Sequence, residues 1–326
     1  RSGNGLLGVG IRLAGFSAIR RCGGTIAQDG AMSAVGLDAA DRFCLDGQRL
    51  RLSSGTYGAA GSVYHTEVES FARITAYGTA GTGPAYFRVE QRNGLIYEYG
   101  ATTASRIEST GSLAAREWAL NRIRDRDGNY ADVVYLEDTA AGSHRPSRID
   151  YAGNLNTGAT PYYSVRFVYE ARPAVDQPSG YLAGGPLGET TRIDRIEVVH
   201  ISSGRVVRSF DFGYQASPAS GRSRLASLQE CAGTTCLSAT QFGWTAASPG
   251  WNGTLAPGVA ATSFATAIPG DMDGDGFDDL AWQDPATRQW MVMRGGSNGF
   301  ASTAVATGLG QDSDGSQAVG IDFDGD

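Results

Sequence analysis

Short runs of alternating apolar and polar residues, joined by glycine-containing turn dipeptides, recur along most of this chain. An Asn-Gly pair such as Asn93-Gly94 tolerates the positive φ that a tight type I′ turn demands, so this pattern is typical of β-hairpins. Three hairpins are predicted on this basis, over residues 43–52, 86–99 and 193–214. The 46 glycines among 326 residues are about twice the usual share, which fits many tight turns. We therefore expect a mainly β fold.

One stretch also fits a helix. Residues 112–127 contain no Gly or Pro, and Ser112 could cap a helix there. Against a helix, Trp118 and Leu120 share the two-residue period of a strand, and a strand-like apolar run follows at residues 133–136. We predict a hairpin at this point as well.

Two related turns lie about 25 residues apart, at residues 122–129 and 148–154. Each is an Arg-Ile strand end followed by a turn with Gly and Asn, which indicates weak internal repetition of hairpins. The first turn also resembles a metal-binding loop through Asp125, Asp127 and Asp132. Its last Asp comes one residue early and Arg126 lies within it, so we predict a plain hairpin turn.

The negative charge is concentrated at one end of the chain. Residues 271–326 hold eleven Asp, no Glu and two Arg, a local balance of −9, whereas residues 1–270 sit near +2. A confined acidic surplus favours a cation site, and the absence of a basic stripe argues against nucleic acid. No segment approaches the roughly 18 apolar residues that a membrane helix needs.

The strongest motif for chemistry is an Asp-rich loop. The carboxylates of Asp271, Asp273 and Asp275 alternate along a glycine-bent turn, where they are expected to converge. Phe277 can offer its carbonyl oxygen, and Asp279 can close the cage. Calcium prefers six to eight oxygen ligands, which this arrangement supplies with a water, so we predict a Ca²⁺ site.

The loop is not an EF-hand. Its twelfth position is Trp282, where a bidentate Glu is needed, and strand-like residues flank it. A second copy begins 51 residues after the first, with Asp322, Asp324 and Asp326 as the corresponding ligands. That offset fits one blade of a β-propeller, with residues 280–293 supplying strands of the blade.

Catalysis finds little support in the sequence. His65, His144 and His200 have no recognisable nucleophile motif beside them, and ordinary core or surface histidines are the simpler interpretation. Glu67 and Glu69 resemble the paired glutamates of ADP-ribosyltransferases. Two Glu at i and i+2 are also what the solvent face of a single strand over residues 63–74 shows. We predict no enzymatic activity.

The four cysteines are Cys22, Cys44, Cys231 and Cys236. Cys231 and Cys236 could close a short loop as a disulfide in an oxidising compartment, or stay as free thiols. Cys22 and Cys44 have no spacing signal, and their pairing is open. A zinc site is disfavoured because the CxxC spacing is absent.

A family resemblance is carried by short motifs spread over residues 1–245, namely Gly3 to Gly10, Ile19 to Cys22, Asp41 to Gly47, Ser53 to Gly58, Arg148 to Tyr151, Ser223 to Leu225, Glu230 to Gly233 and Phe242 to Trp244. Together they resemble the SpvB/TcdB-type amino-terminal region of toxin-complex B components and of relatives with Rhs/YD repeats. Residues 263–326 resemble FG-GAP/VCBS repeats, the integrin-like propeller blades. Residues 246–262, rich in Ala, Ser, Pro and Gly, are interpreted as the linker.

This resemblance implies a curved, shell-like antiparallel sheet of hairpins followed by the start of a propeller. In such B components the shell encloses a toxic carboxy-terminal domain, and the propeller docks onto a pore-forming partner. It implies a non-catalytic structural and translocation part of a secreted, extracellular bacterial protein, of which this chain is an internal piece. The ADP-ribosyltransferase activity of one relative lies in a separate domain that nothing here matches.

Two other functions stay open at this point. The chain could belong to a secreted adhesin that uses the propeller face to bind glycans or host proteins and carries no cargo. It could also be an ADP-ribosyltransferase toxin, which would require NAD hydrolysis that depends on Glu67 or Glu69. The expected partners of the lead hypothesis are protein subunits, either a pore-forming toxin subunit or an Rhs/C-component.

Overall fold

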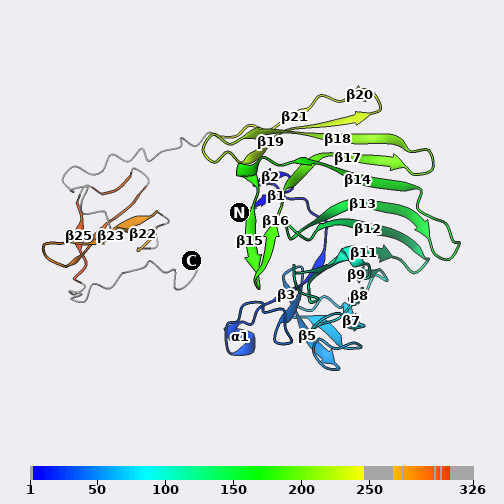
Figure 1. Cartoon of the computed structure of the whole chain (residues 1–326), viewed down its shortest axis with the longest axis horizontal. Helices are drawn as coiled ribbons and strands as arrows, with labels where there is room; N and C mark the ends of the chain where they lie inside the picture. The colour runs from blue at the N-terminus through cyan, green and yellow to red at the C-terminus, as the bar shows by residue number, and fades with distance from the viewer. Residues whose placement is uncertain are drawn as a thin grey trace. The chain divides into compact units, whose positions relative to one another are not determined.

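The hairpins join edge to edge into one antiparallel sheet of 17 strands within the described part of the chain (Figure 1). This computed structural model describes residues 3–245, 267–273, 275, 277–296, 299–301 and 303–308. The chain divides into two compact units, Arg1–Ala247 and Ser248–Asp326. No helix in these described ranges is long and apolar enough to span a bilayer.

Part of the large sheet closes on itself as an eight-stranded barrel. Its strands are β3 (Ala18–Cys22), β4 (Arg42–Leu45), β5 (Gln48–Ser54), β6 (Val63–Thr66), β7 (Arg73–Tyr77), β8 (Tyr86–Glu90), β9 (Ile96–Tyr99) and β11 (Ala115–Arg124). Consecutive strands pair antiparallel, and β11 closes the circle by pairing with both β9 and β3. Closure removes the free edges that an open sheet exposes.

Four aromatic side chains fill the barrel. The ring of Trp118 lies 5.3 Å from that of Phe43 and 5.1 Å from that of Phe87, edge to face, and Tyr64 completes the group. All four rings are buried. The indole N–H of Trp118 donates to the carbonyl of Pro84 at 3.0 Å, so the largest core side chain also has its polar atom satisfied.

The remaining strands of the sheet leave the barrel at β11 and form a long curved sheet (Figure 1). They are β12 (Asn129–Asp138), β13 (Ser143–Asn154), β14 (Tyr163–Ala171), β17 (Thr191–His200), β18 (Arg205–Ala216) and β19 (Ser223–Ala232), with short β20 (Thr235–Cys236) and β21 (Thr240–Gln241) on β19 and β10 (Arg106–Glu108) on β11. Register shifts interrupt the ladders β12–β13, β14–β17, β17–β18 and β18–β19. Such bulges bend a strand and increase its twist, which explains the curvature.

The amino-terminal segment covers one face of the curved sheet. Leu7 packs with Phe167 and Ile193 in a buried cluster, and the amide of Ile193 donates to the carbonyl of Leu6 at 2.9 Å. The fully buried guanidinium of Arg172 donates to the carbonyl of Gly5 at 2.5 Å. These bonds fix the segment on the sheet before the chain enters the barrel at β3.

The smaller elements of the first unit are β1 (Asn4–Gly5), β2 (Gly8–Val9), β15 (Ser179–Leu182), β16 (Gly185–Gly188), α1 (Ile26–Asp29), η1 (Thr103–Ser105) and η2 (Ala174–Asp176). β1 pairs with β2, and β15 pairs with β16 as a separate hairpin. The second unit contains a four-stranded antiparallel sheet of β22 (Ile268–Gly270), β23 (Asp279–Gln283), β24 (Trp290–Met293) and β25 (Val305–Ala306). Leu280, Trp282 and Met293 form its buried cluster.

The hairpin predictions are confirmed. Residues 43–52, 86–99 and 193–214 form β4–β5, β8–β9 and β17–β18, and the ambiguous residues 112–127 form β11, paired with β12. The type I′ prediction for Asn93-Gly94 is wrong. Gly94 has a φ of 86° and its amide donates to Gln91, whereas Asn93 keeps a negative φ, so the loop is one residue longer.

The prediction of a single strand over residues 63–74 is also wrong. β6 ends at Thr66 and β7 begins at Arg73, and the two pair as a hairpin. The connection turns at Phe71, whose φ is 56°. The apolar residues at its two ends belong to neighbouring strands of the barrel.

The two turns that resemble each other lie side by side. The side-chain amide of Asn154 donates to Asn129 at 2.9 Å and to the carbonyl of Asp127 at 3.0 Å. Asp132 is the last carboxylate of the suspected metal loop. It accepts hydrogen bonds from Nε and Nη2 of Arg122, at 2.6 and 2.9 Å. The predicted hairpin is confirmed, since β11 pairs with β12 across this turn.

Both cysteine pairs are bonded. Cys22–Cys44 joins β3 to β4 across a chain separation of 22 residues, and Cys231–Cys236 joins β19 to β20 across 5. The described residues contain no free cysteine. The first bridge lies in the wall of the barrel, where the sequence offered no spacing signal for it.

Candidate functional site

The Asp-rich loop connects β22 to β23 in the second unit. The carboxylates of Asp271, Asp273 and Asp275 are exposed, and one oxygen from each lies within 4.8 Å of the other two. Side chains of the loop accept hydrogen bonds from its own backbone and so hold it in a turn. The amide of Asp275 donates to the Asp271 carboxylate at 3.2 Å, and the amide of Phe277 donates to the Asp275 carboxylate at 2.9 Å. Three of the predicted ligands are therefore brought together.

The other predicted ligands are placed differently. Asp279 is buried, and its two oxygens accept the amide hydrogens of Met272 at 3.0 Å and Gly295 at 2.7 Å, so it anchors the loop to the sheet. The side chain of Phe277 is 44% exposed. The predicted second copy, Asp322, Asp324 and Asp326, lies outside the described residues.

The electrostatics of the loop favour a bound cation. Three carboxylates this close repel one another, and the guanidinium of Arg294 compensates part of this charge by pairing with Asp273 at 2.7 Å. The donors are hard oxygens on an exposed turn, which is the donor set that suits Ca²⁺. Beside the loop, a largely apolar cavity of about 610 Å³ is lined by residues that include Met272, Trp290 and Val305.

The residues considered for catalysis do not assemble. Glu67 accepts a hydrogen bond from Gln28 of α1, whereas Glu69 accepts the amide of Phe71 in the β6–β7 connection at 2.6 Å, so the two carboxylates bond to different parts of the chain. His200 contacts Ser203 in an exposed turn at 2.9 Å. Among the described residues, no histidine bonds both a hydroxyl or thiol and a carboxylate, the arrangement that activates a nucleophile.

An ionic cluster around the buried Glu117 connects the barrel to the curved sheet, and sequence reasoning missed it. Glu117 of β11 is paired with Arg20 of β3 at 2.7 Å and with His144 of β13 at 3.1 Å. Burial alone would raise the pKa of Glu117, but the hydrogen bonds and charges of His144 and Arg20 outweigh burial and lower the pKa to about 2. Glu117 therefore stays ionised, and the three strands share one charge cluster.

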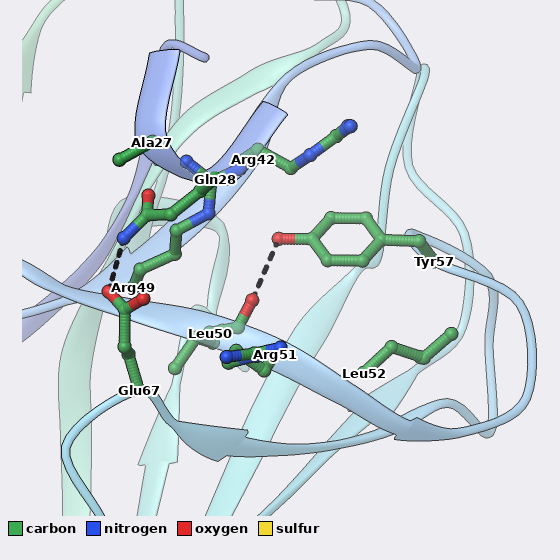
Figure 2. A pocket seen from close by; sticks show the side chains of 9 residues that line it. All are labelled: Ala27, Gln28, Arg42, Arg49, Leu50, Arg51, Leu52, Tyr57 and Glu67. Atoms are coloured by element: carbon green, nitrogen blue, oxygen red, sulfur yellow. Dashed lines mark hydrogen bonds between the residues drawn. The ribbon is translucent and has the colours of Figure 1, made fainter. Parts of the chain in front are cut away.

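A second feature that sequence reasoning missed is a polar pocket of about 400 Å³ in the barrel wall (Figure 2). It is lined by Ala27, Gln28, Arg42, Arg49, Leu50, Arg51, Leu52, Tyr57 and Glu67. Figure 2 shows Tyr57 reaching back to the carbonyl of Leu50, and Gln28 bonded to Glu67. The alternation Arg49-Leu50-Arg51-Leu52 was the available signal, because it places both arginines on one face of β5.

Searches with the sequence alone found no relative, since no family model and no curated protein matches the chain. Solved structures do match its fold. A crystal structure of TcdB2-TccC3-Cdc42 superposes on 94% of this chain with a TM-score of 0.69 at 15% identity. The Photorhabdus luminescens Tc holotoxin pore superposes on 90% with a TM-score of 0.62 at 15% identity.

The N-terminal domain of the effector protein SpvB from Salmonella typhimurium strain LT2 superposes on 71% of the chain and 90% of its own length, with a TM-score of 0.56 at 19% identity. This chain spans only 18% of the TcdB2-TccC3-Cdc42 chain and 17% of the holotoxin chain. At these identities the likeness shows the fold, which is mainly β and of the kind found in those toxin proteins. It agrees with the resemblance stated for residues 1–245.

Proposed function

We propose that this chain is a non-catalytic structural part of a secreted bacterial toxin-complex or Rhs-like protein. In this proposal the curved sheet forms part of a β shell that encloses a toxic cargo. The second unit is the start of a calcium-binding propeller that docks on a partner subunit. Protein subunits of the same complex, pore-forming or Rhs/C-component, are the expected partners.

One observation carries the proposal. The structural likeness to TcdB2-TccC3-Cdc42 extends over 94% of the chain, so it includes residues of both units. The bulges supply a physical reason for a shell, because each register shift in the ladders β12 to β19 adds bend to the sheet. The two disulfides support an oxidising, extracellular environment.

The propeller and its metal rest on the second unit. A four-stranded antiparallel sheet is the size of one propeller blade, and the Asp-rich loop that precedes its second strand brings three carboxylates together. Asp271, Asp273 and Asp275 would hold the ion, with Asp279 fixing the loop behind them. Calcium would supply only charge compensation and loop rigidity at this position.

Expression of the whole gene product tests the shell. We expect particles with a hollow interior in electron microscopy, and a carboxy-terminal segment that resists protease until the shell is unfolded. The same carboxy-terminal segment expressed alone is the control, because it should be digested rapidly. Equal digestion rates in both forms, together with binding of the intact protein to host cells, would favour the adhesin instead.

A further inference from the structure

The polar pocket exists because the barrel wall is opened between β4 and β5. These strands pair only at Cys44–Arg49 and Leu45–Gln48. The next pair along the ladder would be Phe43 with Leu50, and the hydroxyl of Tyr57 lies between them instead. It accepts the Phe43 amide at 2.7 Å and donates to the Leu50 carbonyl at 3.4 Å. Figure 2 shows the second of these two bonds.

The opening leaves part of the β5 edge available. Alternate residues of a strand turn their N–H and C=O groups to opposite edges, so Leu52 presents its backbone to the same edge as Leu50. Within the described ranges, no backbone group pairs with Leu52 on that edge. Leu52 is also 38% exposed, so an added strand can reach it.

The positive charges around the pocket outnumber the negative ones. Asp29 holds Arg49 through both oxygens at 2.6 Å and Arg42 at 3.1 Å. The guanidinium of Arg51 has no ion pair or hydrogen bond with any residue that the structure describes, while its backbone pairs with His65 of β6. With Glu67 as the remaining carboxylate, three arginines face two acids, which leaves a surplus of one positive charge.

The residues that line the pocket also disfavour the binding of a nucleic acid. The ring of Tyr57 is already stacked on Phe43, with centroids 5.3 Å apart, so it is not free to stack on a base. Asp29 pairs with both Arg42 and Arg49, and its negative charge weakens the attraction of these arginines to a chain of phosphates. Ala27 and Leu52 add apolar lining, and exposed Ile26 and Val68 lie next in sequence to lining residues.

We propose that this pocket, which we call the β4–β5 pocket, binds an extended peptide that carries a carboxylate beside an apolar side chain. The carboxylate would pair with the guanidinium of Arg51, which presents two parallel N–H donors to such a group. The peptide backbone would bond to Leu52 at the open edge of β5, as in recognition by strand addition. This proposal is independent of the shell and of the calcium site.

Fluorescence anisotropy with the full chain and labelled peptides tests it at low salt. The probe is an acetylated, amidated Gly-Glu-Leu-Glu-Leu-Gly, with the Gln-for-Glu peptide as its neutral match. A third peptide, neutral but with a free carboxy terminus, distinguishes an internal carboxylate from a terminal one. We expect saturable binding of the acidic peptide, or of the free-terminus peptide, and at least about tenfold weaker binding of the neutral amidated one.

Variants of the chain locate the binding. Arg51→Gln should weaken binding about tenfold, whereas Arg73→Gln, at another exposed arginine of the barrel that does not line the pocket, should leave it unchanged. Glu67→Gln should strengthen binding by about threefold because it removes a repelling charge, and it tests the site even if Arg51→Gln is poorly folded. Two results would overturn the proposal. One is equal binding of the acidic and neutral amidated peptides with no binding of the free-terminus peptide. The other is an equal loss of peptide affinity in Arg51→Gln and Arg73→Gln.

Discussion

The hydroxyl of Tyr57 accepts the amide of Phe43 at 2.7 Å and donates to the carbonyl of Leu50 at 3.4 Å, and so takes the place of a backbone bond between β4 and β5. Burial raises the pKa of Tyr57 to about 12, so the hydroxyl is protonated at all ordinary pH values. The Tyr57 side chain therefore holds β4 and β5 together at this point, and part of the β5 backbone edge stays without a partner strand.

Replacing this hydroxyl should destabilise the barrel. Tyr57→Phe leaves the Phe43 amide without its partner, and an unsatisfied buried donor costs about 1–3 kcal/mol. We expect that loss in the free energy of unfolding, measured by urea denaturation. Tyr181→Phe is the control, because Tyr181 is 79% exposed. If Tyr57→Phe is as stable as the parent, β4 and β5 must pair directly once the hydroxyl is gone.

The charge cluster of Glu117 predicts a pH dependence of stability. Its pKa of about 2 lies below the ordinary value of 4.5, so the ionised form stabilises the fold. This stabilisation is fully present above pH 4.5 and is lost as the pH falls toward 2. The difference between the two pKa values corresponds to roughly 3 kcal/mol.

Glu117→Gln should therefore be less stable than the parent at pH 7, and the difference should shrink between pH 4.5 and pH 2. Denaturation curves at a series of pH values measure this. A matched control is Glu108→Gln, at a half-exposed carboxylate of the neighbouring strand that pairs with Arg106. A pH-independent difference for Glu117→Gln would mean that its packing, and not its charge, matters.

Calcium should stabilise the second unit. A ligand that binds only the folded state raises the midpoint of thermal unfolding, and the effect should be measurable by calorimetry on the full chain. Asp273→Ala should abolish the shift, whereas Asp278→Ala removes the same charge from the same loop outside the group of three and should preserve it. A full calcium response in Asp273→Ala would contradict the assignment.

Replacing Arg294 should have the opposite effect on calcium binding from replacing Asp273. Its guanidinium forms an ion pair with the carboxylate of Asp273 at 2.7 Å, so it competes with a cation for that carboxylate. Arg294→Gln should therefore tighten calcium binding several-fold, which isothermal titration would detect. Arg288→Gln, in the turn between β23 and β24, controls for the loss of positive charge alone. Weaker binding in Arg294→Gln would show that the arginine supports the ion site.

The two disulfides should differ in their contributions. By the loop-entropy argument, the bridge that closes 22 residues stabilises the chain by about 3 kcal/mol and the one that closes 5 by about 2 kcal/mol. Paired Cys22→Ser and Cys44→Ser should lower the unfolding midpoint more than paired Cys231→Ser and Cys236→Ser. The reverse order would indicate that strain or residual structure dominates over loop entropy.

Most strands and the acidic loop could be predicted from the sequence, because these depend on neighbours only a few residues apart. The type of the turn at Asn93-Gly94 and the break between β6 and β7 were not predicted correctly. Alternation and glycine turns predict β4–β5 and β17–β18 without knowledge of the rest of the chain. The convergence of Asp271, Asp273 and Asp275 follows in the same way from their spacing on one bent turn.

The closure of the strands into a barrel could not be predicted from the sequence. The pairing of β11 with both β3 and β9 makes the barrel, and it joins residues about 100 positions apart, such as Arg20 and Glu117. The Glu117 cluster depends on that closure, because Arg20 and Glu117 lie on β3 and β11. No local pattern encodes such contacts, because which strand edges meet is set by burial of the whole aromatic core at once.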